Sequence, residues 1–126
     1  MGGRIRSFVV PVTTAGGAGV AAGNASTTET IEGFLLDISL EYHASAPGTT
    51  DVVITQSGTP TAILTVSNNA TDGRYAVRDA AVNVAAGAAI TNSFVLIPVN
   101  GTFAASVAQC DALTAAVTAT IRVQTL

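Results

Sequence analysis

The most regular pattern of hydrophobic and polar positions in the chain lies between Ile31 and His43. Apolar residues occupy one parity of this segment, at Phe34, Leu36, Ile38, Leu40 and Tyr42. Polar residues occupy the other parity, at Asp37, Ser39, Glu41 and His43. A helix would mix the two classes on every face, whereas a β-strand points successive side chains to opposite faces. The alternation therefore predicts a long strand with one buried face and one solvated face.

Shorter runs of β-forming residues occur in the rest of the chain, separated by turn residues such as those of Asp72-Gly73. Asn100-Gly101 is the strongest hairpin signal, and we expect it to join two adjacent strands. In the last strand we expect an inward-facing set, namely Val117, Ala119, Ile121 and Val123. The predicted strands are residues 4–12, 31–43, 50–56, 61–67, 74–79, 94–99, 102–108 and 116–124.

Eight short strands at spacings of about ten residues predict an all-β fold, an antiparallel β-sandwich. The leading topology is an eight-stranded jelly roll. An immunoglobulin-like sandwich is the alternative, although the chain has one cysteine and no tryptophan and so lacks the core signature of that fold.

Residues 13–30 interrupt the strand pattern, because they are rich in Gly, Ala, Ser and Thr and show no hydrophobic period. A segment of this length is either functional or a flexible linker. We therefore expect residues 1–27 to form an extended N-terminal arm with a Gly/Ala-rich linker, and residues 28–126 to form a single β-sandwich domain. The alternative is a long loop inside one subunit. In the arm, we expect burial against a neighbouring chain for Ile5, Phe8 and Val10.

Composition excludes several classes of protein. Charged residues make up 10% of the chain, against about 25% in an ordinary soluble domain, and the net charge is −3. The five basic residues are scattered arginines, so the chain lacks the cationic surface that a nucleic-acid binder needs. Hydrophobic residues make up 48%, which excludes a disordered chain. The single cysteine excludes an internal disulfide framework and a cysteine-based zinc site.

The chain carries no apolar stretch near the roughly 20 residues that span a bilayer, so we expect no membrane partner. The apolar run after Arg6 ends at Pro11, which is short of the roughly 7–15 apolar residues of a signal peptide. We therefore expect synthesis in the cytoplasm.

Candidate catalytic and metal-binding residues are few. Asp37 and Glu41 share a strand face, but four residues of strand separate their Cα atoms by about 13 Å, too far for paired glycosidase carboxylates. Glu41 and His43 could share a metal ion with Asp51, yet a fourth ligand is missing. Cys110 lacks the cationic setting and oriented base of a nucleophile. The chain is predicted not to be an enzyme and to need no cofactor or metal.

Arg74 and Arg78 lie on one face of a short predicted strand, with Tyr75 on the other. In one interpretation both arginines are solvated or paired with Asp72 and Asp79. In the other, their guanidinium groups contact carboxylates of a partner, since arginine is enriched at interfaces. Together with the N-terminal strand, these positions give the candidate interface residues Arg4, Ile5, Arg6, Phe8, Val10, Arg74, Tyr75 and Arg78.

Three stretches of sequence resemble a family of small virion structural proteins of tailed bacteriophages. They are residues 33–55 (GFLLDISLEYHASAPGTTDVVIT), 64–79 (LTVSNNATDGRYAVRD) and 106–123 (SVAQCDALTAAVTATIRV). The resemblance covers about residues 28–123, and the Ala-rich stretch 80–93 departs from the family pattern. It implies an all-β protein, most similar to capsid decoration (cement) proteins, which bind the outer shell as trimers or other small oligomers.

The resemblance and the composition lead to one expectation of function. The chain is expected to be a bacteriophage virion structural protein, made in the host cytoplasm and located on the outer capsid surface, where it stabilises capsomer joints. Its expected partners are the major capsid protein and further copies of itself, with a trimer favoured. The alternatives are a tail or head–tail connector protein, or a carbohydrate-binding jelly-roll module on the virion.

Overall fold

The computed structural model describes residues 4–58, 61–82, 87 and 89–125. Within these residues, all regular secondary structure is β-strand. The strands are β1 (Ile5–Val12), β2 (Ala21–Ser26), β3 (Ile31–Tyr42), β4 (Asp51–Gln56), β5 (Leu64–Val66), β6 (Gly73–Tyr75), β7 (Asp79–Val82), β8 (Ala89–Val95), β9 (Ile97–Gly101), β10 (Phe103–Cys110) and β11 (Val117–Gln124). In the described part of the chain, no helix is long and apolar enough to cross a membrane.

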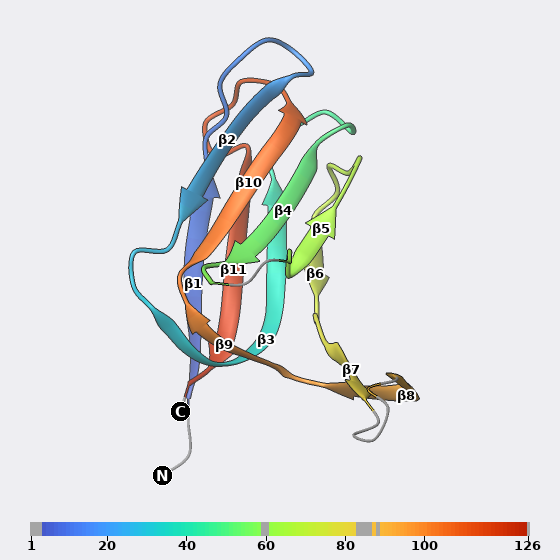
Figure 1. The fold of residues 1–126 in the computed structure, drawn as a ribbon. Coiled ribbons are helices and arrows are strands. Elements are labelled where there is room, and N and C mark those ends of the chain that lie inside the picture. Colours follow the sequence, from blue (N-terminus) through green and yellow to red (C-terminus); the bar gives the residue numbers. More distant parts are fainter. Residues whose placement is uncertain (1–3, 59–60, 83–86, 88, 126) are drawn as a thin grey trace.

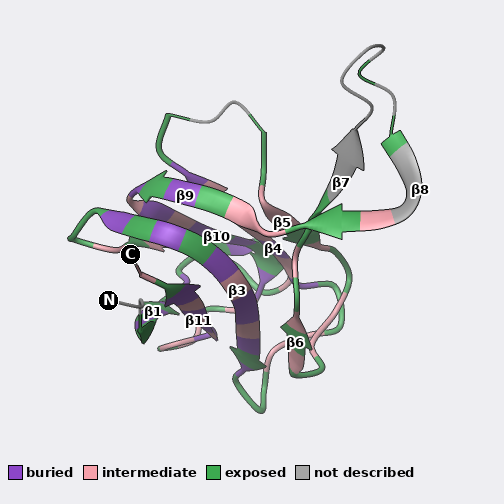
Figure 2. Cartoon of the chain, turned by 90° about the horizontal axis from the view of Figure 1, so that it is seen from below, coloured by how far each residue is buried: buried purple, intermediate pink, exposed green. Residues whose placement is uncertain are grey.

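Two antiparallel sheets pack face to face as a sandwich, which confirms the predicted all-β fold (Figure 1). The five-stranded sheet runs β1-β11-β3-β6, and β9 pairs with β3 beyond the end of β6. The four-stranded sheet runs β2-β10-β4-β5. β7 and β8 pair with each other and form a separate ladder that projects from the sandwich (Figure 2).

The core fills the space between the two sheets with aliphatic side chains and the aromatic rings of Phe8, Tyr42 and Phe103. Strand residues alternate between buried and exposed, as the coloured bands of Figure 2 show. In β11 the inward-facing residues are the four that the alternation predicts, Val117, Ala119, Ile121 and Val123. Each fully buried Val, Leu, Ile or Phe contributes about 1.5–3 kcal/mol by leaving water, so this core accounts for the cohesion of the two sheets.

β3 departs from the strict alternation at a β-bulge. Asp37 lies opposite Arg122 and Leu35 lies opposite Val123, so Leu36 is an extra residue without a partner on β11. The inward-facing residue before the bulge is therefore Leu35, while Phe34 is exposed. The predicted inward positions Phe34 and Leu36 are wrong for this reason, and the prediction of a solvated Asp37 is also wrong.

The N-terminal segment is part of the sandwich, and the expected extended arm is not seen. All eight residues of β1 pair with β11 of the same chain, because the apolar side of the strand completes the five-stranded sheet. The Gly/Ala-rich segment after it contains β2, the edge strand of the second sheet. Phe8 and Val10 belong to the core of their own chain, so their burial does not require a neighbour.

The segment Asn100-Gly101 does not form the predicted hairpin turn. β9 pairs with β3 in the five-stranded sheet, whereas β10 pairs with β2 and β4 in the four-stranded sheet. The chain therefore crosses from one layer of the sandwich to the other at this point. The turn signal is a local property of two residues and does not determine which strand becomes the partner.

Candidate functional site

The first candidate site is a cluster of three arginines around one carboxylate on the five-stranded sheet. Asp37 and Arg122 lie side by side on β3 and β11. The Arg122 side chain donates to both carboxylate oxygens, with Nε 2.9 Å from Oδ1 and 3.2 Å from Oδ2 and with Nη2 bonded to Oδ2. Arg74 on β6 adds an ion pair of 3.1 Å from its Nε to Oδ2. We call Asp37, Arg74, Arg78 and Arg122 the arginine cluster.

Electrostatics holds the Asp37 carboxylate in its charged form. The hydrogen bonds from Arg122 and the positive charges of Arg122, Arg74 and Arg78 lower the pKa of Asp37, against the opposing effect of burial. The same hydrogen bonds and charge raise the pKa of Arg122. Three positive charges face one negative charge, so the arginine cluster carries an excess of positive charge within a chain whose net charge is −3.

The cluster lies on the outward face of the sheet, because Arg122 alternates with the buried Ile121 and Val123 along β11. The side chain of Arg74 is 68% exposed, and that of Asp37 is 3% exposed. Arg78 uses Nη1 to donate to the backbone oxygens of Leu36 and Val77. Guanidinium groups have five N–H donors each, so Arg74 and Arg78 retain donors for carboxylates of a partner.

The structure brings the candidate interface residues Arg74 and Arg78 together with Asp37 and Arg122, which were not candidates for an interface. Arg74 and Arg78 share the cluster, but among the described residues neither forms an ion pair with Asp72 or Asp79; Asp72 instead accepts a hydrogen bond from the Tyr42 backbone N–H. Tyr75 faces the other way and packs half-buried against the core. The alternation of β3 predicts a solvated Asp37, and Arg122 lies between the inward-facing positions Ile121 and Val123 of the last strand. Opposite charges at outward positions of two predicted strands could have indicated a cross-strand ion pair. The sequence pattern does not show that these two strands, β3 and β11, are neighbours.

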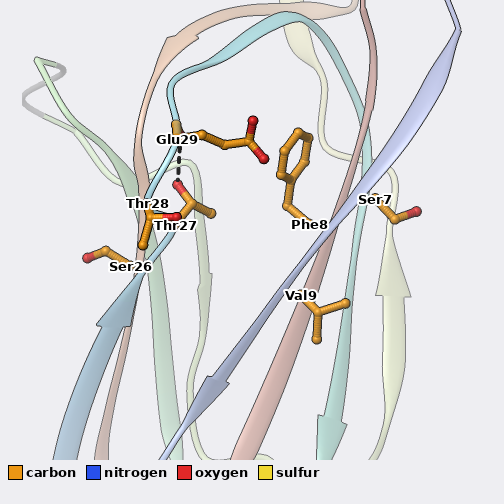
Figure 3. A pocket seen from close by; sticks show the side chains of 7 residues that line it. All are labelled: Ser7, Phe8, Val9, Ser26, Thr27, Thr28 and Glu29. Carbon is orange, nitrogen blue, oxygen red and sulfur yellow. Dashed lines mark hydrogen bonds between the residues drawn. The ribbon is translucent and has the colours of Figure 1, made fainter.

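The second candidate site is a hollow of about 330 Å³ at the free edge of β1 (Figure 3). Phe8 and Glu29 point toward one another across it. Arg6 lies on the rim, where it forms a 3.2 Å ion pair with Glu29 and stacks 4.7 Å above the Phe8 ring. The lining residues are Ser7, Phe8, Val9, Ser26, Thr27, Thr28 and Glu29. We call this place the β1-edge hollow.

The remaining N-terminal candidates lie around the β1-edge hollow or beneath it. Arg4 is exposed just before β1 and Ile5 is exposed at its start. Val10 faces the core. The structure therefore separates the eight candidate interface residues into the β1 edge, the arginine cluster and the core of the sandwich.

The candidates for catalysis and metal binding make local structural contacts. His43 Nδ1 accepts from the backbone N–H of Ser45, and Asp51 accepts from that of Asn68. Cys110 is buried as a free thiol. Within residues 4–58, 61–82, 87 and 89–125, no group of three His, Cys, Asp or Glu side chains could hold a metal ion.

Comparison with known proteins finds no family model that matches the chain and no curated protein with a similar sequence.

Proposed function

We propose that the chain is a structural, non-enzymatic protein of a bacteriophage virion, a head decoration protein that binds the outer capsid surface and stabilises capsomer joints. The resemblance to phage virion proteins supports this function. The three resembling stretches supply most of β3, β4, β10 and β11, which are central strands of the two sheets. The resemblance therefore concerns the framework of the fold, and the partner surface has to be argued from exposed residues.

The strand pairing supports a jelly-roll topology as part of the proposal. Strands from the two ends of the chain pair inward in order: β1 with β11, β2 with β10, β3 with β9, and β4 with β5. This is the pattern of one long hairpin wrapped around a barrel-like core, with β6 and the β7–β8 ladder inserted before β9. Viral capsid domains are among the proteins that use jelly rolls.

The observation that carries the proposed function is the arginine cluster. It is a locally cationic, rigidly held surface on an otherwise acidic chain, and it suits carboxylates on the shell. The buried Asp37 fixes Arg122 and Arg74 in place, so their side chains lose little further entropy on binding. A decoration protein needs only modest contacts of this kind, because multivalent attachment multiplies them.

Binding to head shells of the parent phage, stripped of this protein, tests the proposal. Co-sedimentation is measured for the wild type, for Arg74→Gln and for the control Glu32→Gln, which removes one charge from an exposed residue that belongs to neither the cluster nor the candidate interface residues. We expect Arg74→Gln to weaken binding about tenfold and Glu32→Gln to leave it within about twofold. Absence of wild-type binding would overturn the function, and equal losses in both variants would overturn the role of the cluster.

A further inference from the structure

The β7–β8 ladder exposes apolar side chains on both of its faces. Phe94 is 66% exposed and Val95 is 47% exposed. Successive residues of a strand point to opposite faces, so neither face of the ladder is covered by the sandwich at this point. β8 pairs with β7 and with no other strand of the described residues. A two-stranded ladder is marginally stable in water by itself, so this one is suited to packing against a partner.

The opposite side of the molecule carries an open strand edge. β1 pairs with β11 alone within the described part of the chain, so its other edge presents unpaired N–H and C=O groups. Val9, 62% exposed, lies on this strand beside the β1-edge hollow. Proteins commonly protect such edges with unpaired charges. Here the rim charges of Arg6 and Glu29 neutralise each other and would not repel an incoming strand.

The two surfaces match in size. An apolar cavity of about 150 Å³ accepts a benzene molecule, so the β1-edge hollow, at about 330 Å³, has room for a phenyl ring. β8 has seven residues and β1 has eight, so their free edges have similar lengths. In both views of the fold, the ladder and β1 lie at opposite sides of the sandwich (Figure 1 and Figure 2).

We propose that the partner of the β7–β8 ladder is a second copy of this chain: β8 docks along the β1 edge of the next copy, and Phe94 enters its β1-edge hollow. This inference rests on the proposed function, since decoration proteins are expected to bind as small oligomers, and it names the surfaces that would form the contact between copies. The two surfaces differ and lie on opposite sides, so the contact is head-to-tail. Head-to-tail contacts close into a ring when the rotation between copies allows it, and a trimer is the smallest such ring.

Light scattering coupled to size exclusion tests the contact on purified full-length protein at micromolar concentrations. We expect an oligomeric wild type and monomers for Phe94→Ser and for Val9→Glu. Val20→Ser is the matched control, because Val20 is 68% exposed in the loop before β2 and belongs to neither surface. It should remain oligomeric. A monomeric wild type, or an oligomeric Phe94→Ser variant, would overturn the inference.

Mixing the two monomeric variants tests whether the contact is head-to-tail. Phe94→Ser keeps an intact β1 edge and Val9→Glu keeps an intact ladder, so an equimolar mixture should form heterodimers through one intact contact. A mixture that stays monomeric contradicts the head-to-tail contact. If the wild type is monomeric and still binds head shells, the contact between copies is refuted and the proposed function stands. If the two variants form heterodimers on mixing but the wild type does not bind head shells, the contact stands and the proposed function is refuted.

Discussion

At the scale of single residues, Asp37 is the most consequential side chain outside the apolar core. Its carboxylate is buried at a strand position that looks solvated in the sequence, and it compensates the charge of Arg122 and Arg74. Charged pairs of this kind add little net stability when they form, but removing one partner leaves the other without compensation. Replacing Asp37 is therefore expected to cost stability.

Replacement of Asp37 by Asn should destabilise the fold. The variant keeps the shape of the side chain and removes the charge that faces Arg122, whose side chain is partly exposed and can recover some hydration. We expect a loss of about 2–3 kcal/mol in the free energy of unfolding, measured by urea denaturation. Glu41→Gln, an exposed change on the same strand, is the control and should cost less than about 0.5 kcal/mol. Equal effects of the two changes would contradict the role of Asp37.

The stabilising effect of Asp37 should depend on pH. Its pKa is lowered in the folded protein from the ordinary value of 3.8, so the unfolded chain takes up the proton first as the solution is acidified. The contribution is complete above pH 3.8 and is lost as the pH falls through the lower folded-state pKa. The difference in urea midpoint between wild type and Asp37→Asn should therefore be constant near neutrality and shrink below pH 3.8. A difference that grows on acidification would contradict this account.

At the scale of the elements, β3 organises the five-stranded sheet. It pairs with β11 along one edge and with β6 and β9 along the other. Its bulge turns Asp37 outward to Arg122 and Leu35 inward to the core. The strand also passes very close to β11 at Gly33, where a Cβ atom would lie 2.1 Å from the backbone oxygen of Gln124. The bulge and this close approach shape the sheet beneath the arginine cluster.

Replacement of Gly33 by Ala should therefore disturb the β3–β11 pairing. The added Cβ would meet backbone, which cannot move aside cheaply, and the φ of +147° is unfavourable for any residue with a side chain. We expect a loss of about 2–3 kcal/mol, measured as a lower midpoint of thermal unfolding. Gly48→Ala is the matched control, because a Cβ there meets nothing within 4 Å, and it should change stability by less than about 1 kcal/mol. Similar losses in both variants would show that the close approach is unimportant.

At the scale of the whole molecule, the period-two pattern was sufficient to predict an antiparallel β-sandwich, because burial on one face determines the period of a strand. It missed β2, whose Ala, Gly, Asn and Ser residues have little β-propensity and become a strand through pairing with β10. It predicted a strand at residues 4–12 but expected it to extend as an arm, since an arm and an edge strand share the same alternation; in the structure this strand pairs with β11 of its own chain. Whether this segment is an arm or a sheet strand depends on which strand it pairs with, and so does the contact between Asp37 and Arg122. Strand pairing depends on contacts between residues far apart in the sequence, which a local pattern does not show.

If the protein decorates the head of a phage particle, its copies are spread over the whole shell. The most direct test is the copy number of the protein in purified virions, measured by quantitative mass spectrometry against the major capsid protein. We expect a number comparable to that of the major capsid protein, because a decoration protein binds at repeated joints of the shell. A number that corresponds to a single ring at the neck or tail, or absence from the particle, would contradict it.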